Sequence, residues 1–159
     1  MKIIGIRNED FTNYKDPSLF ICTASCDFKC DRECGRPVCQ NSDLVGEVRT
    51  EVEDDVIITH YLENPITKAI IFGGLEPFDQ YDELFQFISK FRHEYECLDP
   101  VVIYTGYIYR EIESEIRMLS VFPNIIVKFG RFKPDQEPHF DSVLGVNLAS
   151  DNQFAKVIS

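Results

Sequence analysis

The chain has 159 residues, of which 44% are hydrophobic and 13% aromatic, a composition typical of a folded globular protein. It carries 16 lysines and arginines against 27 aspartates and glutamates, so its formal net charge is −11. Nucleic-acid binding depends on Lys and Arg at the phosphates, and no basic cluster is present, so we expect no nucleic-acid partner. No apolar run approaches the roughly 18 residues that span a membrane, and the N-terminus turns polar too soon for a signal peptide. We therefore expect a cytoplasmic protein without a membrane partner.

The hydrophobic pattern predicts one domain over residues 1–159, because no repeat, low-complexity tract or Pro/Gly-rich linker divides the chain. A segment of about 130–155 contains two prolines and no clear periodicity, and we expect a loop that partly covers a binding site. In chain order, the pattern predicts strands over 18–22, 68–72, 100–105 and 124–128, and helices over 51–64, 79–95 and 107–119.

Strands that alternate with helices predict an α/β fold with a parallel sheet and right-handed crossovers. Ligands of such sheets bind at the carboxyl ends of the strands. Glycines follow three of the predicted strands, at Gly73-Gly74, Gly106 and Gly130, and glycine lets a backbone turn sharply or approach a ligand. Several glycines at this edge of the sheet indicate a bound cofactor.

Cysteines give the strongest signal in the sequence. Cys97 stands alone, whereas the other five cysteines fall in one polar segment of about residues 22–41, which we call the cluster loop. In a reducing compartment, such a density of cysteines indicates a metal or an iron–sulfur cluster rather than disulfides. The five cysteines of the cluster loop are Cys22, Cys26, Cys30, Cys34 and Cys39.

The spacing of these cysteines allows several ligand sets. Three thiolates on an iron–sulfur cluster leave one iron open for a substrate or cofactor, whereas four thiolates close a structural zinc site. The alternative to a cluster is therefore a zinc site, for which the paired CxxC spacing of common zinc modules is absent. That zinc site would use Cys26, Cys30, Cys34 and Cys39.

The segment CDFKC…CQNS resembles the cluster loop of radical-SAM proteins that activate glycyl-radical enzymes, in which the motif is CxxxCxxC. Cys26 and Cys30 match the first pair, and Cys39 with the following Gln40-Asn41 matches the last cysteine. Eight residues separate Cys30 from Cys39, where that family usually has two. Cys34 is thus the alternative third ligand, and Cys39 is favoured because Gln40-Asn41 follows it.

Further segments resemble the same family in the same order. GGLEP at 73–77 is similar to its GGEP segment, and VVIYTGY at 101–107 is similar to the YTGY of proteins that activate anaerobic (class III) ribonucleotide reductase. IIVKFGRF at 125–132 resembles a VDG-F segment, with Lys128-Phe129 in place of the usual Val-Asp. The tail at 147–158 resembles an S-x-N-Q ending. These matches extend over most of the chain.

The resemblance implies a partial, open βα barrel with a mainly parallel sheet. It also implies a [4Fe-4S] cluster on Cys26, Cys30 and Cys39, and S-adenosylmethionine bound through its amino and carboxylate groups at the GGLEP backbone. Glu76 is expected to accept a hydrogen bond from the ammonium group of that cofactor. The full set of expected cofactor-binding residues is Asn41, Gly73, Gly74, Glu76, Tyr104, Thr105 and Gly130.

The implied activity is reductive cleavage of S-adenosylmethionine, which generates a glycyl radical on anaerobic ribonucleoside-triphosphate reductase. The partners would be the catalytic subunit of that reductase and a low-potential electron donor such as flavodoxin or ferredoxin. No side chain is expected to act as an acid or base, because the cluster and cofactor carry the chemistry. Two alternatives stay open: a radical-SAM enzyme for another peptide or small molecule, and a zinc-stabilised binding module without catalysis.

Overall fold

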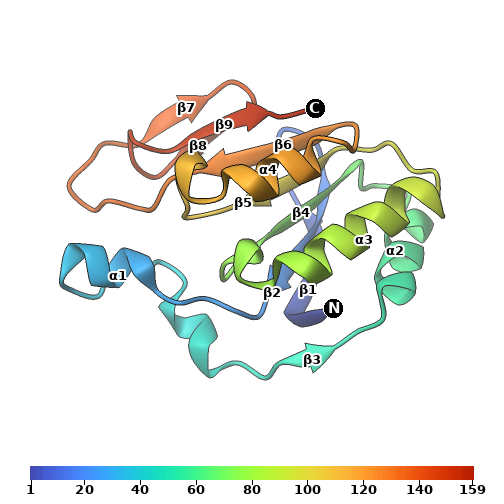
Figure 1. Ribbon diagram of the computed structural model, residues 1–159, viewed down its shortest axis with the longest axis horizontal. Helices are drawn as coiled ribbons and strands as arrows, with labels where there is room; N and C mark the ends of the chain where they lie inside the picture. Colours follow the sequence, from blue (N-terminus) through green and yellow to red (C-terminus); the bar gives the residue numbers. More distant parts are fainter.

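The computed structural model describes residues 1–159 and contains a seven-stranded sheet with the strand order β3-β1-β2-β4-β5-β6-β9 (Figure 1). No helix has the length and apolar character needed to cross a lipid bilayer. The strands of the sheet are β1 (Lys2–Asp10), β2 (Ser18–Thr23), β3 (Thr50–Glu51), β4 (Ala69–Gly74), β5 (Val101–Tyr104), β6 (Ile125–Phe129) and β9 (Phe154–Val157).

The expectation of a partial βα barrel with a mainly parallel sheet is wrong. The pairs β2–β4, β4–β5 and β5–β6 are parallel, whereas β1–β2, β1–β3 and β6–β9 are antiparallel. Crossover helices precede only β4, β5 and β6, and a parallel pair requires such a crossover. The molecule is therefore a mixed α/β fold whose sheet is parallel at its centre and antiparallel at both edges.

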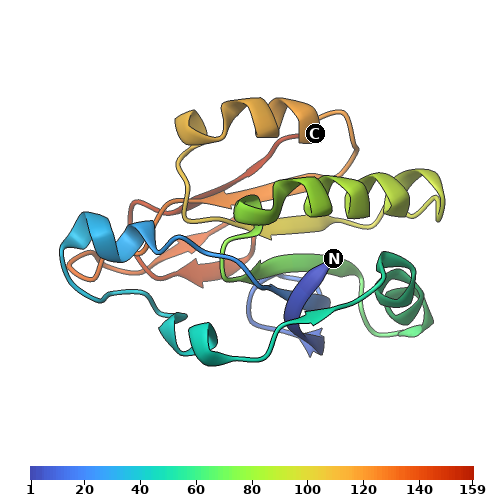
Figure 2. The same ribbon diagram turned by 60° about the horizontal axis from the view of Figure 1, so that its bottom comes forward.

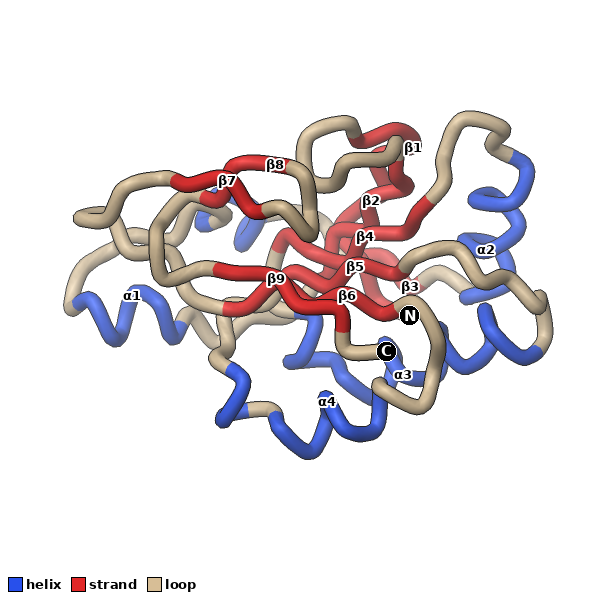
Figure 3. Tube along the Cα trace, turned by 90° about the horizontal axis from the view of Figure 1, so that it is seen from above, coloured by secondary structure: helices blue, strands red, loops and turns tan.

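One face of the sheet is covered by the helices α2 (Asp54–Glu63), α3 (Tyr81–His93) and α4 (Glu113–Leu119), as Figure 3 shows from above. Side chains alternate along each strand, so Phe72 of β4 points to this face and packs edge-on against Phe87 of α3, with ring centroids 5.1 Å apart. Both rings are fully buried in the main core. This core fixes the helices against the parallel strands.

The opposite face of the sheet is covered by a hairpin of β7 (His139–Asp141) and β8 (Val146–Leu148), which lies on the other side of the sheet from the helices (Figure 3). Leu144 and Leu148 of this hairpin pack in a smaller core with Ile71 and Val102 of the sheet. The segment 130–155, expected to be a loop, thus contains a hairpin and the start of an edge strand. That a segment here partly covers a binding site stays a prediction.

The remaining short elements lie at or near the carboxyl ends of the parallel strands. They are α1 (Lys29–Cys34) and three 3-10 helices, η1 (Ser42–Gly46), η2 (Pro77–Gln80) and η3 (Tyr109–Glu111). α1 lies apart from the layer formed by α2, α3 and α4, at one end of the molecule (Figure 2). The predicted strands and the first two predicted helices are confirmed with small shifts at their ends, and the helix expected over 107–119 is divided into η3 and α4. The single domain stays a prediction.

Candidate metal centre

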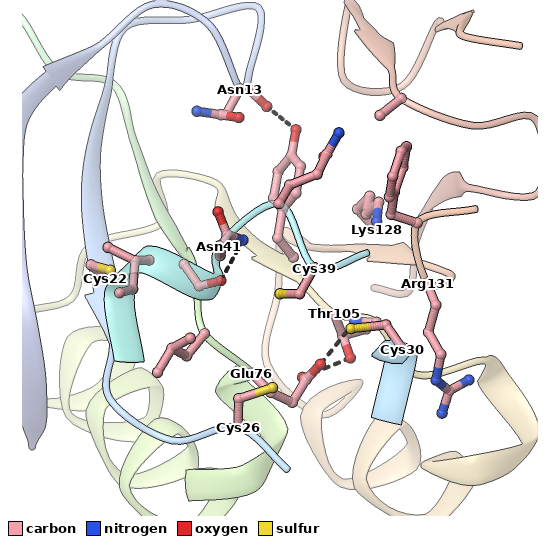
Figure 4. Close-up of a pocket in the computed structure, with 18 of the residues that line it drawn as sticks. Asn13, Cys22, Cys26, Cys30, Cys39, Asn41, Glu76, Thr105, Lys128 and Arg131 are labelled. Atoms are coloured by element: carbon pink, nitrogen blue, oxygen red, sulfur yellow. Dashed lines mark hydrogen bonds between the residues drawn. The ribbon is translucent and has the colours of Figure 1, made fainter. Parts of the chain in front are cut away.

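A pocket of about 830 Å³ lies at the carboxyl ends of the parallel strands, between the cluster loop and the β7–β8 hairpin (Figure 4). Of the residues expected to bind metal or cofactor, Gly73 does not line this pocket, nor does the alternative ligand Cys34. The others line it: Cys26, Cys30, Cys39, Asn41, Gly74, Glu76, Tyr104, Thr105 and Gly130.

Three partly buried thiols, those of Cys26, Cys30 and Cys39, meet in this pocket (Figure 4). Burial is the main reason that the pKa of the Cys26 thiol rises to about 11. Burial likewise raises the pKa of the Cys30 thiol to about 12, and the neighbouring Cys39 thiol adds to the shift. Without a metal, the Cys26 and Cys30 thiols are therefore protonated at neutral pH, and a metal that binds here must displace their protons.

Asp31 explains how Cys39 reaches the other two cysteines across eight intervening residues. Its carboxylate oxygen Oδ1 accepts hydrogen bonds from the backbone N–H groups of Val38 and Cys39, each 2.8 Å long. Gly35, at the end of α1, adopts a left-handed conformation with φ of 64° and turns the chain back toward Asp31. The extra residues therefore form a helical turn that returns to its own start, and Cys34 is left exposed on the outside.

Cys22 also lines the pocket, from the end of β2. Its thiol accepts a hydrogen bond from the backbone of Leu75, and burial raises its pKa. Gly74 has a φ of 87°, and a Cβ there would overlap Cys22 Sγ. The absence of a side chain at Gly74 thus permits the close contact with Cys22. Cys97 lies outside the pocket, beside Asp99 and Arg92.

Asp79 of η2 anchors the cluster loop next to Cys26. Its Oδ2 accepts from the backbone N–H of Asp27 at 2.9 Å, and its Oδ1 accepts from the hydroxyl of Tyr107 at 2.7 Å. Tyr107 follows β5, so Asp27, the residue adjacent to Cys26, is tied to the rim of the sheet. These bonds were not expected from the sequence, because Asp79 belongs to none of the matching motifs.

Glu111 of η3 anchors the loop next to Cys30. Its carboxylate pairs with Lys29 and accepts two hydrogen bonds from Arg131 Nη2, of 2.9 and 2.7 Å. Although partial burial opposes the shift, the bonds from Lys29, Ile108 and Arg131 lower the pKa of Glu111 to about 2, so it is ionised at every physiological pH. The cluster loop is thus held to the sheet by two carboxylates, one beside Cys26 and one beside Cys30.

Glu76 joins the ends of β4 and β5 (Figure 4). Its Oε1 accepts from Thr105 Oγ1 at 2.7 Å and from the backbone of Phe78 at 3.1 Å, and its Oε2 accepts from the backbone of Gly106 at 2.8 Å. Burial raises its pKa to about 7, although these bonds oppose the shift. Both oxygens already have partners within the protein, whereas the sequence suggested a ligand ammonium.

Asn41 and Gly73 have structural roles next to the pocket. The Asn41 amide donates to the carbonyl of Gly74 at 2.7 Å and ties the end of the cluster loop to β4. A Cβ at Gly73 would lie 2.9 Å from the ring of Phe20, so this glycine makes room for an aromatic side chain under the pocket. The sequence did not predict several residues that line the pocket: Asn13, Lys29, Lys128, Arg131 and Gln153. Of these, Lys128 could have been noticed, because it is a charged residue within the apolar run 125–129.

The buried carboxyl of Glu76 makes stability depend on pH. Its folded-state pKa of about 7 exceeds the ordinary value of 4.5, so the folded protein gains stability as pH falls from 7 toward 4.5 and loses it as pH rises. Glu76→Gln removes this titration, so the wild type should gain up to about 3 kcal/mol relative to the variant between pH 8 and pH 5. Urea denaturation at both pH values measures the difference; an equal difference at the two values would show that Glu76 does not titrate in this range.

Comparison with known proteins indicates which kind of metal group the chain carries. No curated protein and no solved structure matches the chain. A family model described as "4Fe-4S single cluster domain" matches residues 17–150, a range that contains the whole cluster loop, the parallel strands and the hairpin. The chain belongs to the family of 4Fe-4S single cluster domains, and it is an iron–sulfur protein.

Proposed function

We propose that the chain is a radical-SAM activating enzyme, which cleaves S-adenosylmethionine reductively and generates a glycyl radical on anaerobic ribonucleotide reductase. The single observation that carries the proposal is that the thiols of Cys26 and Cys30 both lie near the Cys39 thiol, in a large pocket that all three cysteines line. Cys34 is exposed outside the pocket, and the Cys22 thiol is directed to the Leu75 backbone. Three ligands leave one iron of a [4Fe-4S] cluster open, as binding of a cofactor requires.

The residues present fit such a cluster, because its soft irons favour thiolates and the cluster loop supplies three from one short segment. When bound and reduced, the cluster would supply the electron that splits the sulfonium of S-adenosylmethionine into methionine and a 5′-deoxyadenosyl radical. The role of the protein itself is to hold and orient the cluster and the cofactor. Asp31 holds Cys39, while Asp79 and Glu111 hold the residues beside Cys26 and Cys30.

The resemblance of GGLEP and YTGY to the activating proteins supports the choice of substrate. Within this proposal, the end of β4 at Gly73-Gly74 lies beside the amino-acid part of S-adenosylmethionine, and Thr105 and Gly130 line the same pocket. The pocket is broad, and the chain adds little beyond its sheet and hairpin to enclose a small substrate. A large protein substrate that completes the site itself suits this architecture, and a flavodoxin or ferredoxin would deliver the electron.

The zinc alternative required Cys34 beside Cys26, Cys30 and Cys39, and Cys34 is exposed outside the pocket. A different group of side chains could also be considered for a zinc ion. The ligand atoms of Cys26, Asp27 and Asp79 lie within 4.8 Å of one another, as a metal site needs. Both oxygens of Asp79 already accept hydrogen bonds, and Asp27 is paired with Arg32 at 2.6 Å. A zinc ion at this place would have to break these contacts, whereas a cluster on the three thiols leaves them intact.

Radical-SAM activity is tested by anaerobic reconstitution with iron and sulfide, reduction in the presence of S-adenosylmethionine, and an assay for 5′-deoxyadenosine. We expect product from the wild type and from Cys34→Ala and Cys97→Ala. Alanine at any of Cys26, Cys30 or Cys39 should abolish both iron loading and product, since each removes one of three ligands. A colourless protein that holds zinc and forms no product would refute the proposal.

The role of Asp31 gives a second test that needs no turnover. Asp31→Ala leaves the N–H groups of Val38 and Cys39 without their acceptor, so reconstituted protein should lose iron to a chelator about tenfold faster or more. Asp31→Asn keeps an Oδ1 that accepts both bonds and should retain most of the iron. Asp43→Ala is the matched control, because Asp43 lines the same pocket whereas the Cys39 N–H donates to Asp31. Equal iron release from all three variants would show that Asp31 does not position Cys39.

A further inference from the structure

Lys128 of β6 is a buried cation on the pocket wall. It pairs with Tyr104 of β5 across the parallel ladder, and both side chains lie on the face of the sheet that the hairpin covers. Lys128 is only 7% exposed, yet it lines the pocket, and Figure 4 shows it among the lining side chains. A charge with so little access to water needs a partner in the protein or in a ligand.

The chain supplies a carboxylate partner to every other cation of the pocket but not to Lys128. Arg7 pairs with Asp10 at 3.0 Å, and Lys29 and Arg131 both pair with Glu111. No carboxylate oxygen lies within 4.0 Å of Lys128 Nζ. The charge of Lys128 is therefore the one cationic charge of the pocket that no ion pair neutralises.

The hydrogen bonds of Lys128 are also incomplete. Its Nζ donates to the carbonyl of Gly130 at 2.8 Å, and the ring of Tyr104 lies 5.9 Å away. An ammonium group has three N–H donors, so two are left without an acceptor from the protein. Burial lowers the pKa of Lys128 to about 8, which the charge of Glu76 partly opposes. The amine keeps its proton near neutral pH, and a negative group beside it would favour the charged form further.

We propose that Lys128 forms an anion subsite in the pocket and binds a carboxylate group of the substrate. A carboxylate fits better than a phosphate, because one negative charge matches the single unpaired cation. A phosphate dianion would leave a second negative charge without a partner in a chain whose net charge is −11. Lys128 thus has a function in this proposal, the binding of a carboxylate, at a position where the family that the sequence resembles has no cationic residue.

The carboxylate belongs to a molecule other than S-adenosylmethionine, and this part of the inference rests on the proposed function. In the proposed function, the amino-acid end of S-adenosylmethionine lies at the end of β4. Lys128 lies on β6, and β5 separates β6 from β4. Two strand spacings separate the two places by about 10 Å. The subsite therefore fits an acidic side chain or a chain end of the polypeptide substrate.

The test uses the reconstituted protein without S-adenosylmethionine and calorimetric titration with two matched probes, N-acetylalanine and its uncharged amide. We expect the acid to bind at least about tenfold more tightly than the amide, because only the acid forms charge-assisted hydrogen bonds with Lys128. Methyl phosphate, the third probe, should bind more weakly than the acid. Tighter binding of methyl phosphate would overturn the choice of a carboxylate.

Variants separate Lys128 from general charge effects. Lys128→Gln should weaken binding of the acid about tenfold or more and leave binding of the amide unchanged, and Lys128→Arg should keep the preference for the acid. Lys156→Gln, an exposed lysine of β9, is the control and should bind as the wild type does. Wild-type affinity for the acid in Lys128→Gln, or no saturable binding of the acid to the wild type, would overturn the subsite. Because these titrations need no S-adenosylmethionine, their outcome is independent of the 5′-deoxyadenosine assay.

Discussion

The parallel pairing of β2, β4, β5 and β6 is the constraint on which the candidate site depends, because it brings four strand ends to one edge of the sheet. A single buried carboxylate, that of Glu76, then joins two of these ends by accepting bonds from the segments that follow β4 and β5. With that edge fixed, the residues after β5 can hold the cluster loop. The antiparallel edge strands widen the sheet without changing this arrangement.

The cluster loop has almost no hydrophobic core of its own, since α1 buries no residue. Its shape comes from carboxylates instead. Asp31 closes the loop on itself, and Asp79 and Glu111 attach it to the rim of the sheet. A 4Fe-4S cluster held by cysteines of this segment would add further attachments, so metal binding and the order of this loop are coupled. An acidic chain thus uses part of its negative charge to shape a site for a thiolate-bound cluster.

Much of the fold could be predicted from the sequence, because the central strands are short apolar runs and α3 has one apolar face. The edge strands could not be predicted in the same way. β1 mixes apolar and charged residues, and β9 is short, so their places in the sheet depend on pairing with residues distant in the chain. A barrel was expected from resemblance, whereas local pattern alone predicted only the parallel crossovers that the structure has.

The candidate site was predictable to a similar extent. The choice of Cys39 over Cys34 followed from the residues after it, and the structure places Cys39 in the pocket with Cys26 and Cys30. The reason, two backbone bonds to Asp31, cannot be read from spacing. Lys128 was visible as a charge in an apolar strand, but the sequence does not say which face of the sheet it occupies or that it lacks an ion pair.

The central claim is that three cysteines hold a four-iron cluster whose fourth iron is open to S-adenosylmethionine. Mössbauer spectroscopy of protein reconstituted with ⁵⁷Fe tests it most directly, because it counts iron environments without any turnover. The account predicts a [4Fe-4S] spectrum in which about a quarter of the iron signal changes when S-adenosylmethionine is added. Four irons that stay alike and unaffected by the cofactor would contradict an open iron and, with it, the proposed chemistry.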